Sequence, residues 1–234
     1  MNILEKRLAD LANLPSVIPG DQIQLKPDCV FVSGQSSRNV IKAFTRLGFK
    51  NVKHSARIIF SDGKTEAEEI EQFCAEKGIK VITYDLPQHF RTENKLLNGM
   101  VIAGIDENVK SLAGYGAIPI IISPDSMAAC LAAGSFSMFI PESIYIEING
   151  LLGGRVTGKM LCSYLVNIFD DSLIGNAVIL GGKVFEQLNA EDRKELSEFF
   201  HLSSAAIGIC SPGGPYGQVE SVIKLTSEDM NILT

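Results

Sequence analysis

Three carboxylates follow apolar segments of the chain closely enough to act as acids, bases or ligand-binding groups. Asp62 comes just after the apolar segment Arg57–Phe60. Asp106 and Glu107 come just after a second one, Gly99–Gly104. Open α/β sheets bind ligands at the carboxyl ends of their strands, which makes these carboxylates candidate catalytic residues. Two alternatives remain: both aspartates can be local turn or cap residues, and adjacent carboxylates need not face one site.

Two serines at a strand-to-helix turn are candidate substrate-binding residues. The apolar segment Cys29–Ser33 is followed by Gly34. Ser36 and Ser37 then precede a helical pattern of apolar residues. Free amides and hydroxyls at such a turn can hold an anion. The alternative is an ordinary N-cap of the helix that follows.

Short apolar segments that alternate with amphipathic ones must position these side chains. The predicted strands are Gln22–Lys26, Cys29–Ser33, Arg57–Phe60, Lys80–Tyr84, Gly99–Gly104, Ala117–Ser123, Ile144–Ile148, Ala177–Leu180 and Val219–Leu225. Strands that are apolar throughout indicate burial on both faces. The sequence therefore predicts an α/β fold with a largely parallel, mixed sheet and helices on both faces. We expect a single module over residues 1–234, with an internal subdivision near 110–120.

Cap residues mark several of the predicted helices. Ser123 suits an N-cap, and Gly134 suits the end of the same helix. Asn189 suits the N-cap of a helix that runs toward Ser203. A Thr-Glu-Ala-Glu sequence, Thr65–Glu68, indicates a capping box at the start of another helix.

The composition excludes several classes of partner. Apolar residues make up 46% of the 234 residues, and 21 Lys and Arg stand against 27 Asp and Glu, for a net charge of −6. Without a basic cluster the chain is a poor partner for nucleic acid or an anionic membrane. No apolar run approaches the ~20 residues of a membrane span. The N-terminal sequence MNILEKRLADLANL lacks the apolar region of a signal peptide, so we expect a cytoplasmic protein.

The cysteines and histidines do not have the spacing of a metal site. The five cysteines are scattered along the chain, at Cys29, Cys74, Cys130, Cys162 and Cys210. No CxxC or CxxxC pair occurs, which argues against a zinc site or a self-contained iron–sulfur site. We expect buried, reduced thiols. His54 and His201 are expected at surface or helix-end positions.

A series of motifs between residues 124 and 159 resembles one protein family. The motifs are PDSMAA at Pro124–Ala129, Gly134, PESI at Pro141–Ile144, Gly150 and VTGK at Val156–Lys159. Their order and spacing resemble the aconitase family, especially the large subunits of 3-isopropylmalate dehydratase and homoaconitase. The resemblance extends from about Glu5 to Pro212 and implies the fold of the first domain of the aconitase iron–sulfur region.

The resemblance also implies a chemistry and a cofactor. Aconitase-type enzymes dehydrate and rehydrate small hydroxy-polycarboxylates on a 4Fe–4S cluster, whose open iron acts as a Lewis acid. The family's cluster cysteines lie in G-S-C-T and CxxC segments, beyond the point where this sequence ends. We therefore expect an N-terminal module of the large subunit with no cluster ligands and no cofactor in this chain.

One acid–base motif of the family is altered at the matching positions of this chain. The family's G-A-D-S-H-T motif falls on Gly104–Val109, where Asp106 is kept. Glu107 replaces the serine of the motif, and Asn108 replaces its histidine. The resemblance thus implies a catalytic role for Asp106 and Glu107 and a substrate-binding role for Asn108.

Two further motifs of the family are also altered. Its F-D-H motif falls near Phe60–Gly63, where Asp62 is kept and the histidine is lost. Its G-I-C-H-Q motif falls near Tyr84–His89, where Gln88 and His89 occur in reversed order. His89 is thus a candidate catalytic residue, and Gln88 a candidate substrate-binding residue. Losing two of three histidines should remove most acid–base capacity, because histidine has an unperturbed pKa of ~6.5, near neutrality.

Three functions follow from these residues. The first is a catalytically degenerate, cluster-free aconitase-like module that binds a small carboxylate, a partner subunit or a second copy of itself. The second is a hydro-lyase or isomerase that acts on a small hydroxy-carboxylic acid through His89 and the three carboxylates. The third is a split dehydratase subunit whose cluster domain is encoded separately.

Overall fold

The computed structural model describes residues 1–33, 36–61, 67–83, 85–92, 97–152 and 156–226. Its strands are β1 Gln22–Leu25, β2 Cys29–Val32, β3 Ile58–Ser61, β4 Lys80–Ile82, β5 Val101–Gly104, β6 Ile118–Ile121, β7 Phe136–Phe139, β8 Ser143–Ile148, β9 Ala177–Gly181, β10 Ile207–Cys210 and β11 Ser221–Leu225. Its α-helices are α1 Ile3–Ala12, α2 Ser36–Arg46, α3 Ala67–Lys77, α4 Leu86–Thr92, α5 Pro124–Ala133, α6 Gly158–Phe169, α7 Val184–Gln187, α8 Ala190–Ser197 and α9 Phe199–Leu202. Three 3-10 helices are η1 Ser55–Arg57, η2 Glu107–Tyr115 and η3 Asp170–Leu173.

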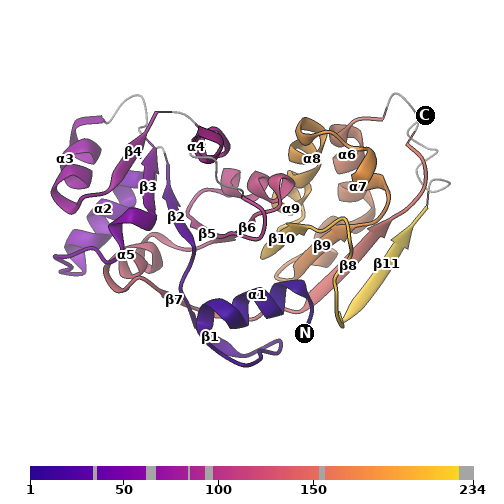
Figure 1. Cartoon of the computed structure of the whole chain (residues 1–234), viewed down its shortest axis with the longest axis horizontal. Helices are drawn as coiled ribbons and strands as arrows, with labels where there is room; N and C mark the ends of the chain where they lie inside the picture. The colour runs from indigo at the N-terminus through magenta and orange to yellow at the C-terminus, as the bar shows by residue number, and fades with distance from the viewer. Residues whose placement is uncertain (34–35, 62–66, 84, 93–96, 153–155, 227–234) are drawn as a thin grey trace.

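One long sheet runs through the molecule (Figure 1). Its nine strands follow the order β11-β8-β9-β10-β6-β5-β2-β3-β4, and β1 pairs with β7 in a separate two-stranded sheet. The predicted α/β class with a largely parallel sheet is confirmed. In the described part of the chain, none of the helices has the length and apolar character needed to span a bilayer.

The long sheet consists of two parallel halves that run in opposite directions. Neighbouring strands are parallel within the first half, β2–β6, and within the second half, β8–β11. The halves meet where β6 and β10 pair antiparallel, with Ile120 opposite Ile207. The carboxyl ends of the strands therefore lie at opposite ends of the sheet in the two halves. The prediction of one module subdivided near 110–120 stays a prediction.

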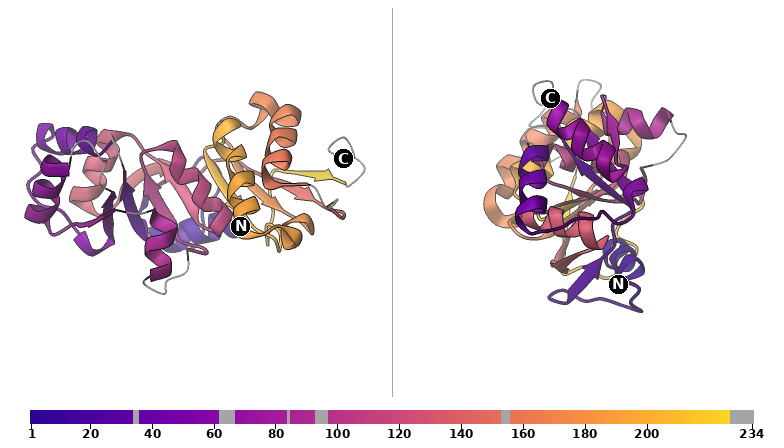
Figure 2. Two further views of the ribbon diagram at one scale, coloured as in Figure 1. Left: turned by 90° about the horizontal axis from the view of Figure 1, so that it is seen from above. Right: turned by 90° about the vertical axis from the view of Figure 1, so that its left-hand side faces the viewer.

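Helices cover both faces of the first half, and each half has its own aromatic core. Along β2, Val30 and Val32 pack in a core with residues of α2, α3 and α5, whereas Phe31 packs with residues of α4 and η2. The second half buries Phe185, Phe199 and Phe200 between its strands and helices. Figure 2 shows the two halves side by side along the long axis.

The predicted helix caps form where local chemistry favours them. The Ser123 hydroxyl accepts the N–H of Ser126, and Gly134 ends α5 with a φ of 76°. Asn189 accepts two backbone N–H groups at the start of α8. The capping box predicted at Thr65–Glu68 includes residues outside the described part of the chain.

One helix prediction is wrong in extent. The helix that begins after Asn189 does not continue to Ser203 but divides into α8 and α9. Ser197 lies at the break, where its hydroxyl donates to the carbonyl of Lys194 and to that of Ser111. A serine that bonds the backbone in this way competes with the regular helical hydrogen bonds.

Candidate functional site

Asp106 lies where the order of the strands reverses. From β2 the chain leads outward to β3 and β4, and then returns to β5 on the other side of β2. Such a reversal point is where open α/β sheets bind ligands. The hydroxyl of Ser33 donates to Asp106 Oδ2 at 2.7 Å, and the hydroxyl of Ser36 donates to Asp106 Oδ1. Asp106 and Ser36, two of the predicted site residues, are thus in contact.

The structure does not show the side chain of Asp106 acting as a local helix cap. Asp106 occupies the N-cap position of η2, but its side chain makes no capping hydrogen bond there. It instead accepts hydroxyls that come from β2 and α2, about seventy residues earlier in the chain. The side chain therefore joins two strand ends.

Glu107 forms a polar cluster with a lysine and a histidine. Its Oε2 atom lies 2.8 Å from Lys110 Nζ and 3.2 Å from His201 Nδ1. Partial burial alone would raise the pKa of Glu107, but the hydrogen bonds and charges of Lys110 and His201 outweigh it, and the pKa is lowered. Glu107 is therefore a stable carboxylate that bridges η2 of the first half and α9 of the second.

Two neighbouring hollows open beside this cluster, and together we call them the cleft. One, of about 460 Å³, is lined by Glu107, Ser111, Lys194, Glu198, His201 and Leu202. The other, of about 390 Å³, lies over the carboxyl ends of β2, β3 and β4, and its polar lining is Ser61, Thr83, Asp85, Ser111 and Lys194. Both hollows share Ser111 and Lys194. Among the described residues, no ion pair involves the Lys194 ammonium group.

The structure does not bring His89 to Asp106. His89 is buried in a different hollow, of about 420 Å³, together with Asp28, Arg57 and Lys80. These three residues lie at the beginnings of β2, β3 and β4, whereas Asp106 follows the end of β5. Helix α4 carries His89 back toward the amino ends of the strands, so the expectation that it shares one pocket with Asp106 is wrong.

The remaining predicted site residues have separate environments. Ser37 is fully buried next to Ser36, and within the described part of the chain its hydroxyl has no hydrogen-bond partner. Gln88 is exposed on α4. Asp62 and the side chain of Asn108 lie outside what the structure describes. Among the predicted site residues that the structure describes, Asp106 and Ser36 are thus in contact, whereas Glu107 lies in a separate cluster with Lys110 and His201.

Three basic residues near the cleft, Lys110, Lys194 and His201, were not predicted as site residues from the sequence. His201 lies 94 residues from Glu107 in the chain, so no local pattern could have paired them. Lys194 reaches the cleft from α8 of the second half, where it follows no motif. Lys110 could have been found, because residues three apart on a helix face each other and can form an ion pair.

The cysteines do not fit an iron–sulfur cluster. All five are free and buried, as the sequence predicted. Burial raises the thiol pKa to about 12 at Cys74, Cys130 and Cys210, and to about 11 at Cys162. Cluster ligands are thiolates gathered at one point. No group of three or more potential metal ligands occurs among the described residues.

Comparisons of the sequence give relatives of one kind, although no family model matches the chain. The chain is 26% identical over 248 residues to the 3-isopropylmalate dehydratase large subunit of Clostridium kluyveri, covering 99% of this chain and 57% of that protein. It is 28% identical to large subunit 1 of the same enzyme from Pyrococcus abyssi, covering 91% and 54%. It is 26% identical to a probable methanogen homoaconitase large subunit of Methanothermobacter thermautotrophicus, covering 91% and 54%. The chain thus spans about half the length of the curated relatives it matches.

A solved structure has the same fold. The holo-form of Thermococcus kodakaraensis aconitase X matches with a TM-score of 0.54 and 14% sequence identity, over 98% of this chain and 62% of that chain. At this identity the match concerns the fold alone. Together with the sequence relatives it confirms the predicted resemblance: the chain is an aconitase-like protein, similar over most of its length to the large subunits of 3-isopropylmalate dehydratase and homoaconitase.

Proposed function

We propose that this chain is an aconitase-like module that binds a small carboxylate in the cleft and has no iron–sulfur cluster of its own. The observation that carries the proposal is Lys194. Lys194 lines both hollows, and its ammonium group makes no ion pair with another described residue. An unpaired ammonium group beside a hollow can hold a carboxylate by a charge-assisted hydrogen bond.

Two of the acidic residues near the cleft, Glu107 and Asp106, are already paired within the chain. Glu107 is balanced by Lys110 and His201. The carboxylate of Asp106 accepts hydrogen bonds from the hydroxyls of Ser33 and Ser36. Ser111 adds a hydroxyl beside Lys194 in both hollows. Asp85 and Glu198 also line the hollows, so a small hydroxy-carboxylate must bind at Lys194 and the neighbouring hydroxyl groups rather than beside these two carboxylates.

A thermal-shift titration with di- and tricarboxylates tests the proposal. A ligand at a hundred times its Kd stabilises the folded chain by about 2.7 kcal/mol, so the melting temperature should rise with concentration. Lys194→Ala should remove the shift, whereas Lys42→Ala, which truncates an exposed lysine on α2, should keep it. The proposal is wrong if no carboxylate raises the melting temperature at millimolar concentration, or if Lys194→Ala keeps the full shift.

The contact between Glu107 and His201 favours a second candidate function, that of a hydro-lyase. A carboxylate that accepts the proton of Nδ1 orients the imidazole and leaves Nε2 to hold or release a proton. Dehydration of a hydroxy-acid needs such a group to protonate the departing hydroxyl. In this role the chain acts alone or with a partner subunit whose cluster domain is encoded separately, since the matched relatives are named large subunits.

Two measurements distinguish these functions. Hydration of unsaturated carboxylates can be followed by the loss of their ultraviolet absorbance, and His201→Ala should abolish it if the chain is a hydro-lyase. Lys42→Ala again serves as the control. Anaerobic incubation of the chain with iron and sulfide should give no stable cluster absorbance. A stable cluster on the isolated chain would overturn the cluster-free proposal.

A further inference from the structure

A further hollow lies at the carboxyl ends of the strands in the second half, and we call it the β8 hollow. It measures about 640 Å³, and its lining includes Glu147, Asn149, Gly182, Lys183 and Gly213. These residues end or follow β8, β9 and β10, three neighbouring parallel strands. The β8 hollow shares no lining residue with the cleft, so the two are separate candidate sites.

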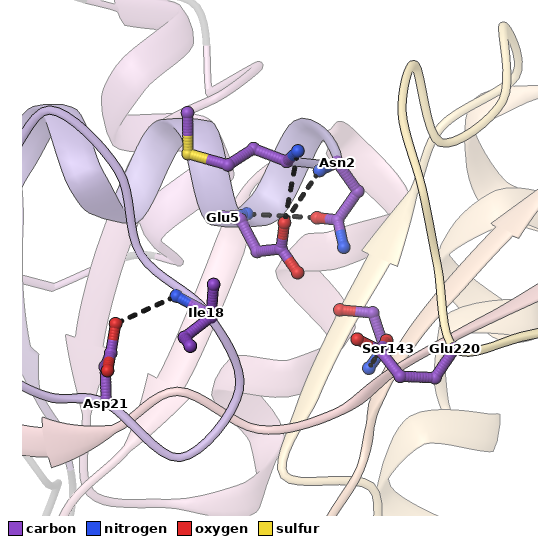
Figure 3. A network of polar contacts seen from close by, with 7 residues as sticks. Asn2, Glu5, Ile18, Asp21, Ser143 and Glu220 are labelled. Atoms are coloured by element: carbon purple, nitrogen blue, oxygen red, sulfur yellow. Dashed lines mark hydrogen bonds and ion pairs between the residues drawn. The ribbon is translucent and has the colours of Figure 1, made fainter.

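The order of the strands reverses at the β8 hollow. From β8 the chain leads to β9 and β10, and then returns to β11 on the other side of β8. Two hydrogen bonds fix β11 beside the start of β8: the N–H of Ser143 donates to the side chain of Glu220 at 2.6 Å (Figure 3), and the N–H of Glu220 donates to the carbonyl of Ser143 at 3.0 Å. β8 thus has the place in the second half that β2 has in the first. Open α/β sheets bind ligands at such reversal points.

Two amide side chains hold the loop after β8 against the turn after β9. Asn149 Oδ1 accepts the N–H of Lys183 at 3.1 Å. The side chain of Gln187 accepts the N–H of Leu152 at 2.9 Å and donates to the carbonyl of Gly150 at 2.9 Å. This wall of the β8 hollow is therefore fixed before a ligand arrives, which lowers the entropy cost of binding.

Backbone N–H groups in the lining are available to a ligand. Those of Gly150, Leu151 and Gly213 donate no hydrogen bond to another residue in the described part of the chain. Two of the three are successive along the loop after β8. Successive N–H groups in a turn can hold an anion. The loop therefore offers donors to an anionic group of a ligand.

Two side chains of opposite charge in the lining also have no partner. Lys183 and Glu186 both line the β8 hollow, and neither forms an ion pair with another described residue. The other charged residue of the lining, Glu147, lies opposite Lys224 of β11 and pairs with it at 3.7 Å. One cation and one carboxylate are thus left for a ligand.

We propose that the β8 hollow binds a free α-amino acid. The carboxylate of the ligand accepts hydrogen bonds from the Lys183 ammonium group and from the N–H groups of Gly150 and Leu151, and the ammonium group of the ligand donates to Glu186. Charge-assisted hydrogen bonds are stronger than neutral ones, so a ligand that carries both charges fits better than one that carries either alone. The apolar side chain of Leu151, which is 84% exposed, offers a contact for the side chain of the ligand.

Calorimetric titration of the full chain with each of the common L-amino acids tests the proposal. At least one should bind, and the same compound without its amino group, or without its carboxylate, should bind at least about tenfold more weakly because one charged hydrogen bond is lost. Lys194→Ala should not change this affinity, since Lys194 lines only the cleft among these hollows. The proposal is wrong if no amino acid binds at millimolar concentration, if either analogue binds as tightly, or if Lys194→Ala abolishes binding.

Two substitutions test the two ends of the ligand separately. Lys183→Ala should weaken binding of the amino acid by about tenfold or more. Glu186→Gln should remove the preference for the amino acid over its analogue without the amino group. Both side chains are exposed, so both variants should fold, which circular dichroism checks. Glu191→Gln neutralises an exposed carboxylate on α8, outside the β8 hollow, and should keep the preference. A folded Lys183→Ala chain of unchanged affinity, or a preference that survives in Glu186→Gln, overturns the proposal.

Discussion

The two halves of the long sheet are built alike but place different groups at the carboxyl ends of their strands. The first half places Asp106, Ser33 and Ser36 there, joined by hydrogen bonds. The second half places Gly181 and Gly182 there, where an added Cβ would overlap the carbonyl oxygens of Ser211 and Ile148, respectively. The second half also has a hollow at these ends, the β8 hollow of about 640 Å³, whose lining includes Glu147, Asn149 and Lys183, but at its glycines the backbone packs directly against backbone.

The second half nevertheless contributes to the cleft through its helices. Lys194 of α8 and His201 of α9 face Glu107 and Ser111 of η2 across the junction. The first half supplies Glu107, and the second half supplies Lys194 and His201 as well as the carboxylate Glu198. The comparison indicates that the second half is a rigid support that carries charged groups to a site in the first, and each half should respond differently to substitution.

Overfilling the helix packing of the second half should have the largest effect on stability. An added Cβ at Gly158, at the start of α6, would overlap the backbone of Asp192 on α8. Gly158→Val should therefore destabilise the chain by about 3 kcal/mol, because the backbone of Asp192 would have to move to make room for the new side chain. Urea unfolding measures the change, and Lys159→Ala on the exposed side of the same helix should alter stability by less than about 0.5 kcal/mol. A small effect of Gly158→Val would contradict the rigid-support interpretation.

Removing the central carboxylate of the first half should have a smaller effect on stability. Asp106→Ala deprives the hydroxyls of Ser33 and Ser36 of a charged acceptor, which should cost about 2 kcal/mol. Asp106→Asn keeps an acceptor oxygen and should cost less. Unfolding of both variants, combined with the carboxylate titration, separates the structural role from the binding role. If Asp106→Ala and Asp106→Asn are equally unstable, the hydroxyl contacts are not what the aspartate provides.

The elements that local chemistry determines could be predicted from the sequence. Ser123 and Asn189 act as N-caps because their side chains satisfy amides within three residues. Most of the strands, including β11, were predicted from apolar runs in the sequence, but β10 at Ile207–Cys210 was not. For the same reason Asp106 could be placed at a strand end before its partners were known.

The parts that depend on contacts distant in sequence could not be predicted. His201 was expected at a surface or helix end, and nothing local connects it with Glu107. His89 was expected in the site because it falls near the family's G-I-C-H-Q motif, but α4 turns it toward the other end of the sheet. β7 was also missed, because it has only four residues, and half of them are exposed. Tertiary packing determines these positions.

The buried thiols should make both halves lose stability at alkaline pH. Burial raises the pKa of Cys130 from 9.0 to about 12, so this thiol stays protonated in the folded chain and ionises first in the unfolded chain. A thiol with a higher pKa in the folded chain than in the unfolded chain stabilises the folded chain fully at any pH below the unfolded pKa. This stabilisation is lost as the pH rises from the unfolded pKa toward the folded pKa. Stability should therefore decline from pH 9.0 toward about 12.

Substitution of one thiol tests this decline. Cys130→Ala should reduce the loss of stability between about pH 8 and about pH 10 by about 1 kcal/mol. Leu131→Ala removes apolar volume from the same helix without removing a titrating group, so it should destabilise the chain equally at both pH values. Urea unfolding at the two pH values gives all four free energies. An unchanged decline in Cys130→Ala would mean that this thiol does not titrate on unfolding.

Breaking the contact between Glu107 and His201, which joins the two halves, should have the smallest effect on stability. Glu107 and His201 are both substantially exposed, so their coupling is expected at about 0.2–1 kcal/mol and should weaken with salt. A double-mutant cycle of Glu107→Gln and His201→Ala measures it, and the exposed pair Arg46 and Asp125, which lies within the first half, serves as the control.

The pH dependence of this coupling has a definite sign. The pKa of Glu107 is lower in the folded chain than its ordinary value of 4.5. The carboxylate therefore contributes its full stabilisation of the folded chain above pH 4.5, and this stabilisation is lost as the pH falls through the folded pKa. The cycle should therefore give a coupling near neutral pH that vanishes in acid. If Lys194→Ala abolishes ligand binding while this coupling is zero at every pH, the cleft binds its ligand without help from the Glu107–His201 contact. The hydro-lyase function would then lose its main support, whereas the carboxylate-binding function would stand.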